Sequence, residues 1–367
     1  MTQAGCSQFF GKWEASSSKT KPKQDLIRHL IEPRSFIGRF HPPIERSTPI
    51  IVGDVLYVGS IHDQFMAVRK KSGSVIWRKH IPGGVESQAA FFDQKVYFGA
   101  NDGNFYCLNA NTGEEIWKYN TKIEVHSTPL LKGGTVYFST LNNGLYALKA
   151  EDGKWLWYYN KGYIQKISVR GSASPVYHDG KIFIGFSDGY FYAFNAFDGS
   201  VAWFKNLAKG QSKFMDMDVT PLVSDRDILT AGFDGSIYSL NTTSGNIDWK
   251  YQAESMNGLV ATQDSVFGVT TEGVILSLDR KTGSKQWDSK IKEGTPSGMI
   301  LVEDQLIVPT MEKYVYSVSM DDGMQIWRYN AGTGVTSKPV FGIDKIYLYS
   351  NFSALHKIDP FYLLYAP

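Results

Sequence analysis

The chain has 367 residues, of which 43% are hydrophobic and 14% aromatic, and its formal net charge at pH 7 is +2. This near balance does not indicate binding to nucleic acid or to an anionic membrane surface. Its two cysteines, Cys6 and Cys107, exclude a disulfide-rich scaffold and a cysteine-based zinc cage. The sequence has no apolar run that approaches the roughly 18–20 residues needed to cross a bilayer.

The first part of the chain is polar and basic. Residues 1–40 hold seven Lys or Arg against three Asp or Glu, which leaves 31 positive and 33 negative residues in the remainder. In MTQAGCSQFF the small residues Ala4 and Gly5 lead into Cys6, as at the end of a bacterial lipobox, although Gln3 stands where Leu is preferred. We therefore expect a lipoprotein-type tether at residues 1–33 with Cys6 as the lipid attachment site. The alternative is an incidental free cysteine.

An internal repeat follows the tether. Seven segments end in a glycine, three further residues and a tryptophan, and these motifs recur every 38 to 46 residues. Each unit is predicted to contain four short strands, separated by turns such as Asn143-Gly144 and Asp152-Gly153, which favour tight hairpins. Four antiparallel strands at this period are typical of a β-propeller blade. The seven tryptophans are Trp77, Trp117, Trp157, Trp203, Trp249, Trp287 and Trp327.

The tryptophans are expected to fill the space between neighbouring blades and to donate their N–H groups to backbone across the gap. After Trp327, residues 338–359 supply three further strands without a tryptophan. The segment RSFIGRF (34–40) has the spacing of an outer strand, so we expect it to complete this last blade and close the ring. The predicted fold is therefore all-β: an eight-bladed β-propeller of four-stranded antiparallel blades over residues 34–360, closed by an N-terminal strand, with a C-terminal tail at 361–367.

Two consecutive connections between blades are longer than the others. Trp117 is followed by Pro129 after 12 residues, whereas Trp157 precedes Pro175 by 18 and Trp203 precedes Pro221 by 18. Links between antiparallel blades lie on the same face as the turns between second and third strands, so both long connections should rise from one face.

These connections carry residue types that are frequent in protein interfaces. The candidate residues are Ile167, Val169 and Arg170 on the first connection and Asp216 and Asp218 on the second. The alternative is that Arg170 pairs with one of the two aspartates and the loops satisfy each other internally. Both can hold, because an internal pair could shape the surface that a partner contacts.

The sequence offers little support for catalysis, although this tryptophan pattern resembles pyrroloquinoline-quinone dehydrogenases. Those enzymes typically use adjacent cysteines and a calcium site, whereas Cys107 occupies the place of Ala147 and is expected in the core. The seven histidines never show a metal-ligand spacing such as HxH or HExxH. Asp216 and Asp218 have no partner base. We therefore predict no catalytic residue, no cofactor and no metal.

The whole chain resembles the BamB family of outer-membrane protein assembly factors. The most specific stretches are ISVRGSASP (167–175) and MDMDVTPLV (215–223), which are similar to the family's apolar-Ser-apolar-Arg-Gly and Asp-x-Asp-x-Thr-Pro motifs. In the family these loops dock onto a periplasmic POTRA domain of BamA, which implies the five residues named above as docking residues. Ile167 and Val169 replace what are commonly leucines in the family.

The resemblance implies a non-catalytic scaffold lipoprotein of the β-barrel assembly machinery, held at the periplasmic face of the outer membrane and monomeric within a complex. It implies a BamA-like outer-membrane protein as partner, with unfolded outer-membrane proteins as further binding partners. Two alternatives stay open. One is a quinone- or small-ligand-binding propeller, as an enzyme or a sensor ectodomain, and the other is a cytosolic propeller in which Cys6 is incidental.

Overall fold

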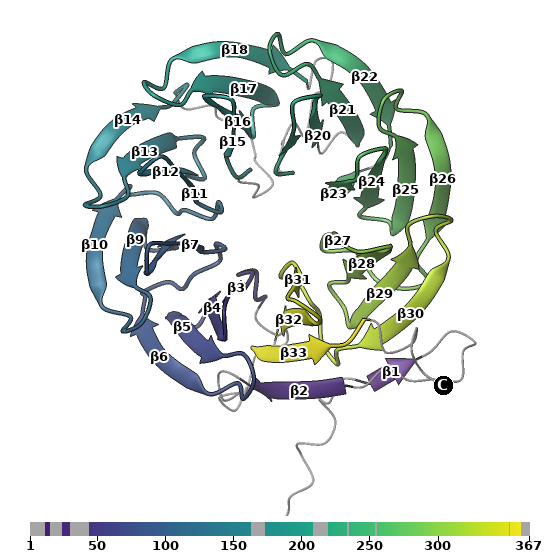
Figure 1. The fold of residues 1–367 in the computed structure, drawn as a ribbon, viewed down its shortest axis with the longest axis horizontal. Coiled ribbons are helices and arrows are strands. Elements are labelled where there is room, and N and C mark those ends of the chain that lie inside the picture. Colours follow the sequence, from purple (N-terminus) through teal and green to yellow (C-terminus); the bar gives the residue numbers. More distant parts are fainter. Residues whose placement is uncertain are drawn as a thin grey trace, which may run out of the picture.

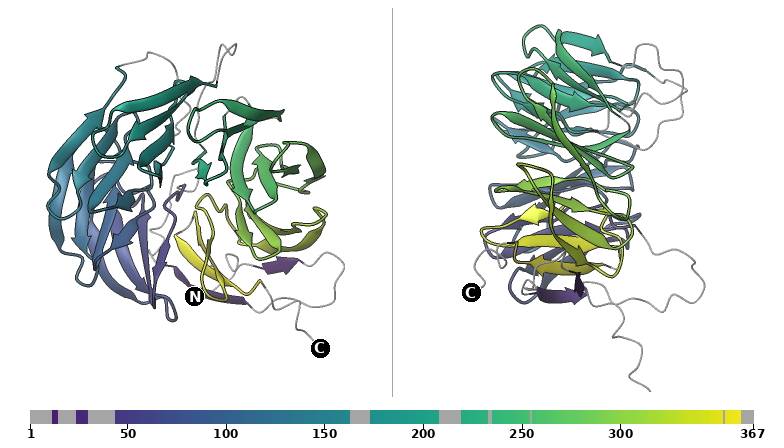
Figure 2. Two further views of the ribbon diagram at one scale, coloured as in Figure 1. Left: turned by 45° about the horizontal axis from the view of Figure 1, so that its top comes forward. Right: turned by 90° about the vertical axis from the view of Figure 1, so that its right-hand side faces the viewer.

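The computed structural model describes residues 44–162, 173–207, 219–232, 235–253, 255–351 and 353–360, together with strands at 12–14 and 24–29. Within these ranges the regular structure consists of β-strands and turns. The strands form eight antiparallel sheets arranged around a central axis (Figure 1), and the side view shows them as one layer of blades (Figure 2). The predicted eight-bladed β-propeller is confirmed. No helix in the described part of the chain is long and apolar enough to span a membrane.

The first four blades follow one another along the chain, each running from its innermost to its outermost strand. Their strands are β3 (Ile50–Val52), β4 (Val55–Ser60), β5 (Gln64–Arg69) and β6 (Val75–His80); β7 (Ala90–Phe92), β8 (Lys95–Gly99), β9 (Asn104–Asn109) and β10 (Glu115–Asn120); β11 (Leu130–Lys132), β12 (Thr135–Ser139), β13 (Leu145–Lys149) and β14 (Trp155–Tyr159); β15 (Val176–His178), β16 (Lys181–Gly185), β17 (Tyr190–Asn195) and β18 (Val201–Asn206).

The last four blades continue the same order until the eighth, which takes only three strands from the end of the chain. Their strands are β19 (Leu222–Val223), β20 (Ile228–Ala231), β21 (Ser236–Leu240) and β22 (Ile247–Gln252); β23 (Met256–Ala261), β24 (Ser265–Thr270), β25 (Val274–Asp279) and β26 (Lys285–Lys290); β27 (Ile300–Val302), β28 (Gln305–Pro309), β29 (Tyr314–Ser319) and β30 (Gln325–Asn330); β31 (Val340–Phe341), β32 (Ile346–Ser350) and β33 (Ala354–Ile358).

An N-terminal strand closes the ring, but it is not the predicted one. The outer strand of the eighth blade is β2 (Gln24–His29), which pairs antiparallel with β33 in the register Gln24↔Ile358 to His29↔Ala354. The prediction of residues 34–40 was therefore wrong. It assumed that the link to the first blade has the usual length, whereas this link is about ten residues longer. The closing strand accordingly lies inside the segment that we expected to be a tether.

A second N-terminal strand adds to a blade that is already complete. Strand β1 (Lys12–Glu14) pairs antiparallel with β30, which makes the seventh blade five-stranded. The sequence analysis did not predict this strand, because three residues are too short for a periodic pattern. Its backbone covers part of an outer edge that is otherwise open to pairing.

Burial changes from the inside of each blade to the outside. The two middle strands are buried on both faces, as in β8 (Lys95–Gly99), where all residues after Lys95 are buried. The outer strands β6, β10, β18 and β26 alternate between half-buried and exposed residues, because only one of their faces packs against the ring. Cys107 is fully buried between the second and third blades, which confirms its predicted place in the core.

The tryptophans join one blade to the next, as predicted. Six of the seven donate their indole N–H to a backbone carbonyl at the next blade's turn between third and fourth strands. The acceptors are the carbonyl oxygens of Ala110, Ala150, Ala196, Thr242, Arg280 and Met320, at 2.8–3.2 Å from Trp77, Trp117, Trp157, Trp203, Trp249 and Trp287. Trp327 differs, since it donates to Gln305 Oε1 within its own blade at 3.2 Å.

The junction between the last and first blades has a buried carboxylate at a position that is apolar at three other junctions. Val85, Val125 and Val335 occupy one equivalent, fully buried position, and at this junction the position is Glu45, which is also 0% exposed. Its carboxylate accepts hydrogen bonds at 2.7 Å from the hydroxyls of Ser60 in the first blade and Ser353 in the eighth.

Burial raises the pKa of the Glu45 carboxyl above its ordinary value of 4.5, although the hydrogen bonds from Ser353 and Ser60 oppose this. The imidazole of His62 lies 4.0 Å from the carboxylate. Because the folded protein holds the proton more tightly than the unfolded chain, the carboxyl favours folding most at low pH. That contribution is lost as the pH rises from about 4.5 through the raised pKa.

Substitution of one tryptophan tests the junctions. Trp157→Ala should lower the free energy of unfolding by about 3–5 kcal/mol, because it removes a buried indole and its bond to Ala196. Trp155→Ala is a matched control on the same strand, since Trp155 is 57% exposed. We expect it to change stability by less than about 0.5 kcal/mol in urea denaturation. Equal losses for the two variants would contradict the role of Trp157 between blades.

The pH dependence of stability tests Glu45. The free energy of unfolding is compared between the wild-type protein and Glu45→Gln at each pH. As the pH rises above about 4.5, the value for the wild-type protein should fall relative to the value for the variant. The change should be about 1.4 kcal/mol for each unit by which folding raises the pKa. Thermal and urea denaturation across this pH range measure the difference. Parallel stability curves would show that Glu45 does not titrate differently on folding.

Candidate functional site

The residues predicted for docking and lipid attachment lie outside the described residues, so their positions stay predictions. They are Cys6, Ile167, Val169, Arg170, Asp216 and Asp218. The structure does describe where the two long connections leave the ring and where they return. Those ends define the candidate site.

Both connections leave the ring beside one turn of the fourth blade. This turn joins β16 to β17 and contains Asp188 and Gly189. Lys161, at the start of the first connection, donates from Nζ to Asp188 Oδ2 at 3.1 Å. Leu207, which ends the fourth blade before the second connection, donates its backbone N–H to the carbonyl of Gly189 at 3.0 Å. Adjacent residues of a single turn therefore hold the starts of both connections.

Lys161 breaks the pattern that the other blades follow. The residue four positions after the tryptophan normally donates its backbone N–H to the turn between the second and third strands of its own blade. Ile81, Thr121, Leu207, Ala253, Ile291 and Ala331 all do so. In the third blade this residue is Lys161, and its side chain reaches across to the fourth blade. The start of the first connection is therefore bonded to the fourth blade.

The Lys161 contact combines charge and aromatic packing. The Asp188 side chain is only 4% exposed, whereas that of Lys161 is 34% exposed. The Lys161 ammonium also lies 3.4 Å from the centroid of the Tyr190 ring, within range of a cation–π interaction. Because removal of the lysine would leave a nearly buried carboxylate without its charge partner, this pair should hold more firmly than an exposed ion pair.

An aromatic cluster lies next to the start of the first connection. The Tyr159 ring centroid lies 4.6 Å from that of Phe194, 5.6 Å from that of Tyr192 and 6.4 Å from that of Phe186. Burial, followed by the nearby Tyr159 hydroxyl and the charge of Asp188, raises the pKa of Tyr192, so its hydroxyl stays protonated at neutral pH. The cluster joins the third blade to the fourth.

Two of the described ends are also bonded to neighbouring blades. Where the first connection returns, the Ser139 hydroxyl donates to the carbonyl of Ala173 at 2.8 Å, and Thr128 N–H donates to Ser174 Oγ at 2.9 Å. Where the second begins, the Tyr238 hydroxyl donates to the carbonyl of Leu207 at 2.8 Å. These bonds link each end to a neighbouring blade.

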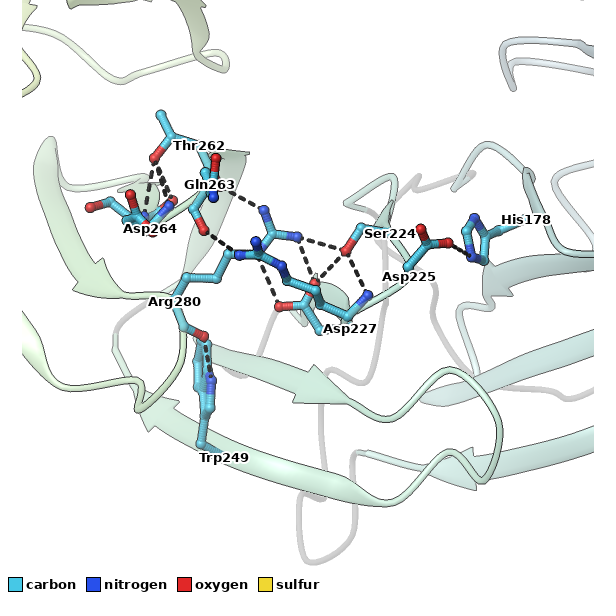
Figure 3. Close-up of polar contacts among 11 residues, drawn as sticks. His178, Ser224, Asp225, Asp227, Trp249, Thr262, Gln263, Asp264 and Arg280 are labelled. Atoms are coloured by element: carbon cyan, nitrogen blue, oxygen red, sulfur yellow. Dashed lines mark hydrogen bonds and ion pairs between the residues drawn. The ribbon is translucent and has the colours of Figure 1, made fainter.

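The opposite face of the ring holds a polar network between the fifth and sixth blades (Figure 3). Arg280 donates from Nε and Nη2 to the two carboxylate oxygens of Asp227, at 3.0 and 2.6 Å, and from Nη1 to the carbonyl of Thr262 at 2.6 Å. The carbonyl of Arg280 accepts the indole N–H of Trp249 (Figure 3). Because these bonds join residues of the fifth and sixth blades, the network reinforces a blade junction.

Two hollows lie on that same opposite face. One of about 900 Å³ spans the second to fourth blades, and the exposed Phe92 and Phe197 contribute to its lining. The other, of about 460 Å³, is lined in part by His178 and Asp225, whose Nε2 and Oδ1 atoms lie 3.1 Å apart (Figure 3). Both hollows are open, and neither contains a recognisable catalytic arrangement.

The described residues provide little reactive chemistry. No group of three His, Cys, Asp or Glu side chains among them is placed to hold a metal ion. Burial raises the pKa of the Cys107 thiol to about 12, so it is not a thiolate at neutral pH and cannot act as a nucleophile.

The sequence analysis missed Lys161 and Asp188. Asp188-Gly189 is one of several Asp-Gly turns in the repeats, so nothing in the sequence marks its carboxylate as buried. A signal for Lys161 was available, because the residue four positions after the tryptophan is uncharged in the other six repeats that contain a tryptophan.

Comparison with known proteins gives a family and a shared fold. The sequence profile described as "Outer membrane protein assembly factor BamB" matches residues 13–104, 83–289 and 271–360. A search of curated proteins found no match to this sequence. Among solved structures, BamB from Moraxella catarrhalis aligns with a TM-score of 0.76 and 21% identity, over 87% of this chain and 98% of that one.

Proteins of other functions share the architecture. Quinohemoprotein alcohol dehydrogenase from Comamonas testosteroni aligns with a TM-score of 0.67 and 14% identity, over 84% of this chain and 70% of that one. Sqt1 from Saccharomyces cerevisiae aligns with a TM-score of 0.72 and 12% identity, over 87% and 96%. At such identities these similarities show the fold alone, because one fold can carry many functions.

Proposed function

Because the chain belongs to the BamB family of outer membrane protein assembly factors, we propose that it is a non-catalytic scaffold of the β-barrel assembly machinery. In this role it binds a POTRA domain of a BamA-like outer-membrane protein and supports the assembly and insertion of outer-membrane proteins. Unfolded outer-membrane proteins are further proposed partners. The observation that carries the proposal is the origin of both long connections beside one turn of the fourth blade.

The proposed docking residues are those that the family motifs identify: Ile167, Val169, Arg170, Asp216 and Asp218. Support comes from the bases of the two connections. Lys161 and Leu207 are bonded to adjacent residues of the same turn, so the two connections begin as neighbours. A binding surface assembled from two loops needs such fixed starting points, because ordering loose loops on binding would reduce affinity.

The scaffold role is supported over quinone-dependent catalysis by the chemistry of the described residues. The likeness to a quinohemoprotein dehydrogenase is one of fold. Cys107 is buried with a raised thiol pKa, and the other cysteine, Cys6, lies 101 positions away in the sequence.

We also propose that Cys6 carries a lipid that holds the scaffold at the periplasmic face of the outer membrane. Support comes from the small residues Ala4 and Gly5 before it and from the family. The alternative is an incidental cysteine in a protein that is held by its partner alone.

Arg170→Ala tests the docking site. We expect it to weaken binding to the purified POTRA domains of the same organism's BamA by roughly thirtyfold or more, because an arginine at the centre of an interface commonly contributes about 2 kcal/mol. The melting temperature should change by no more than a few degrees. Arg226→Ala is the matched control, since Arg226 is exposed on the opposite face. Calorimetry and thermal melting of the same preparations give both quantities.

Asp216→Ala extends the same measurement to the second connection. A matching loss of binding at unchanged stability would place both connections in one interface. If Arg170 instead serves only an internal pair, binding will survive in both variants, or stability and binding will fall together. Intact binding by a normally folded Arg170→Ala protein would refute the docking site.

Cys6→Ser tests the anchor independently of docking. The protein with its native leader should partition into the membrane fraction and incorporate a fatty-acid probe, and Cys6→Ser should lose the probe. Membrane association is measured for proteins that also carry Arg170→Ala, so that binding to BamA cannot retain them at the membrane. Absence of the probe from the wild-type protein would refute lipidation.

A further inference from the structure

The turn between the third and fourth strands of the fourth blade carries an aromatic residue where the other repeats are polar. The residue two positions before the motif glycine is Lys71, Asn111, Glu151, Thr243, Lys281 or Asp321 in six repeats. In the fourth blade this residue is Phe197, which is 94% exposed. Because its side chain adds little to the core, Phe197 is a candidate for contact with another molecule.

A second departure from the repeat lies in the neighbouring third blade, where the innermost strand ends in a lysine. The innermost strands of the other blades end in Val52, Phe92, His178, Val223, Ala261, Val302 and Phe341. The Nζ atom of Lys132 lies 4.9 Å from the centroid of the Tyr177 ring in the fourth blade, within range of a cation–π interaction. Among the described residues, no carboxylate forms an ion pair with Lys132.

Phe197 and Lys132 line one hollow, the one of about 900 Å³ on the face opposite to the two long connections. The second blade contributes Phe92 to the same hollow, and this residue is 53% exposed. Strands β7, β11 and β15 of the second, third and fourth blades follow one another around the ring (Figure 1). The order of the blades therefore places Lys132 between two exposed phenylalanines.

Positive charge exceeds negative charge in this hollow. Its lining includes Lys95, Lys132 and Lys149, together with Asp93 and Glu151. Lys95 Nζ lies 3.9 Å from Asp93 Oδ2, so these two charges offset each other. The two other lysines outnumber the one remaining carboxylate, and the hollow therefore complements a negative group.

The turn that carries Phe197 is held in place by the junction between the third and fourth blades. The carbonyl of Ala196, the preceding residue, accepts the indole N–H of Trp157 and the hydroxyl of Tyr137, each at 3.0 Å. A ligand that contacts Phe197 therefore does not have to order this part of the backbone, which would otherwise reduce its affinity.

We propose that this hollow binds an extended peptide segment that carries carboxylates between two aromatic side chains. The aromatic side chains contact Phe92 and Phe197, and a carboxylate pairs with the Lys132 ammonium. A peptide suits a site that spans three blades, because its side chains are spaced along one backbone. The site uses no residue of the two long connections, so it goes beyond the proposed scaffold role and does not depend on it.

The experiment uses the full chain and a short fluorescent peptide with the core Phe-Glu-Glu-Phe. Fluorescence anisotropy should show saturable binding of this peptide. A peptide with the core Phe-Lys-Lys-Phe tests the charge, and one with the core Ser-Glu-Glu-Ser tests the aromatic side chains. Both should bind more weakly than the first peptide, because each lacks one of the two kinds of contact.

Two variants with matched controls locate the binding site. Phe197→Ser should weaken binding of the Phe-Glu-Glu-Phe peptide roughly tenfold or more, whereas Ile343→Ser should not, although Ile343 is also 94% exposed on a turn of the same face. Lys132→Met should weaken binding about two- to fivefold, as expected for an exposed ion pair. Lys281→Met is its control, since Lys281 is exposed on a turn of the sixth blade.

The proposal is overturned if the Phe-Glu-Glu-Phe peptide does not bind saturably, if the Phe-Lys-Lys-Phe peptide binds equally well, or if folded Phe197→Ser keeps the wild-type affinity. Sedimentation of the protein alone tests a different occupant. A dimer that Phe197→Ser dissociates would show that a second copy of the chain fills the hollow, and this would also overturn the proposal. Arg170→Ala should bind the peptide as the wild-type protein does, which separates this test from that of POTRA binding.

Discussion

Each blade depends on its neighbour through a contact between an indole and a glycine. A Cβ atom at Gly113 would lie 2.6 Å from the ring of Trp77, and the same distance separates Gly153 from Trp117, so no other residue fits without displacement. The glycine and the tryptophan of one motif therefore belong to two different junctions. The glycine receives the indole of the preceding blade, and the tryptophan contacts the following one. A single repeat cannot satisfy both contacts, which explains why they occur in an unbroken series.

The series must end where the ring closes, and there the chain uses different interactions. The eighth blade has no tryptophan, and although Trp327 lies in one apolar cluster with Ile346 and Leu348 of that blade, its indole N–H bonds within the seventh blade. Backbone pairing of β2 with β33 replaces the missing outer strand. Near the axis, the buried carboxylate of Glu45 joins serines of the first and eighth blades. Closure therefore adds backbone pairing and a buried carboxylate to the apolar contacts between the first and eighth blades.

The sequence predicts those features of the fold that the repeat constrains. It does not predict the features that lie outside the repeat. The number of blades followed from the tryptophan spacing because each indole must meet the next glycine. The closing strand was misplaced by about ten residues because no such contact sets the length of its link. Asp188 could not be recognised, since burial of its carboxylate depends on Lys161 arriving from another blade. The docking residues stay predictions, because they lie in connections that do not follow the repeat.

The same constraint indicates where function can be added to this fold. The indole contacts lie between outer strands and the turns of the next blade, so they leave the links between blades free to vary. Lys161 is a charged residue at a position that is uncharged in the other repeats, and it bonds to the fourth blade without disturbing a tryptophan. Departures from the repeat at such positions can alter a surface of the ring while the tryptophan junctions stay intact.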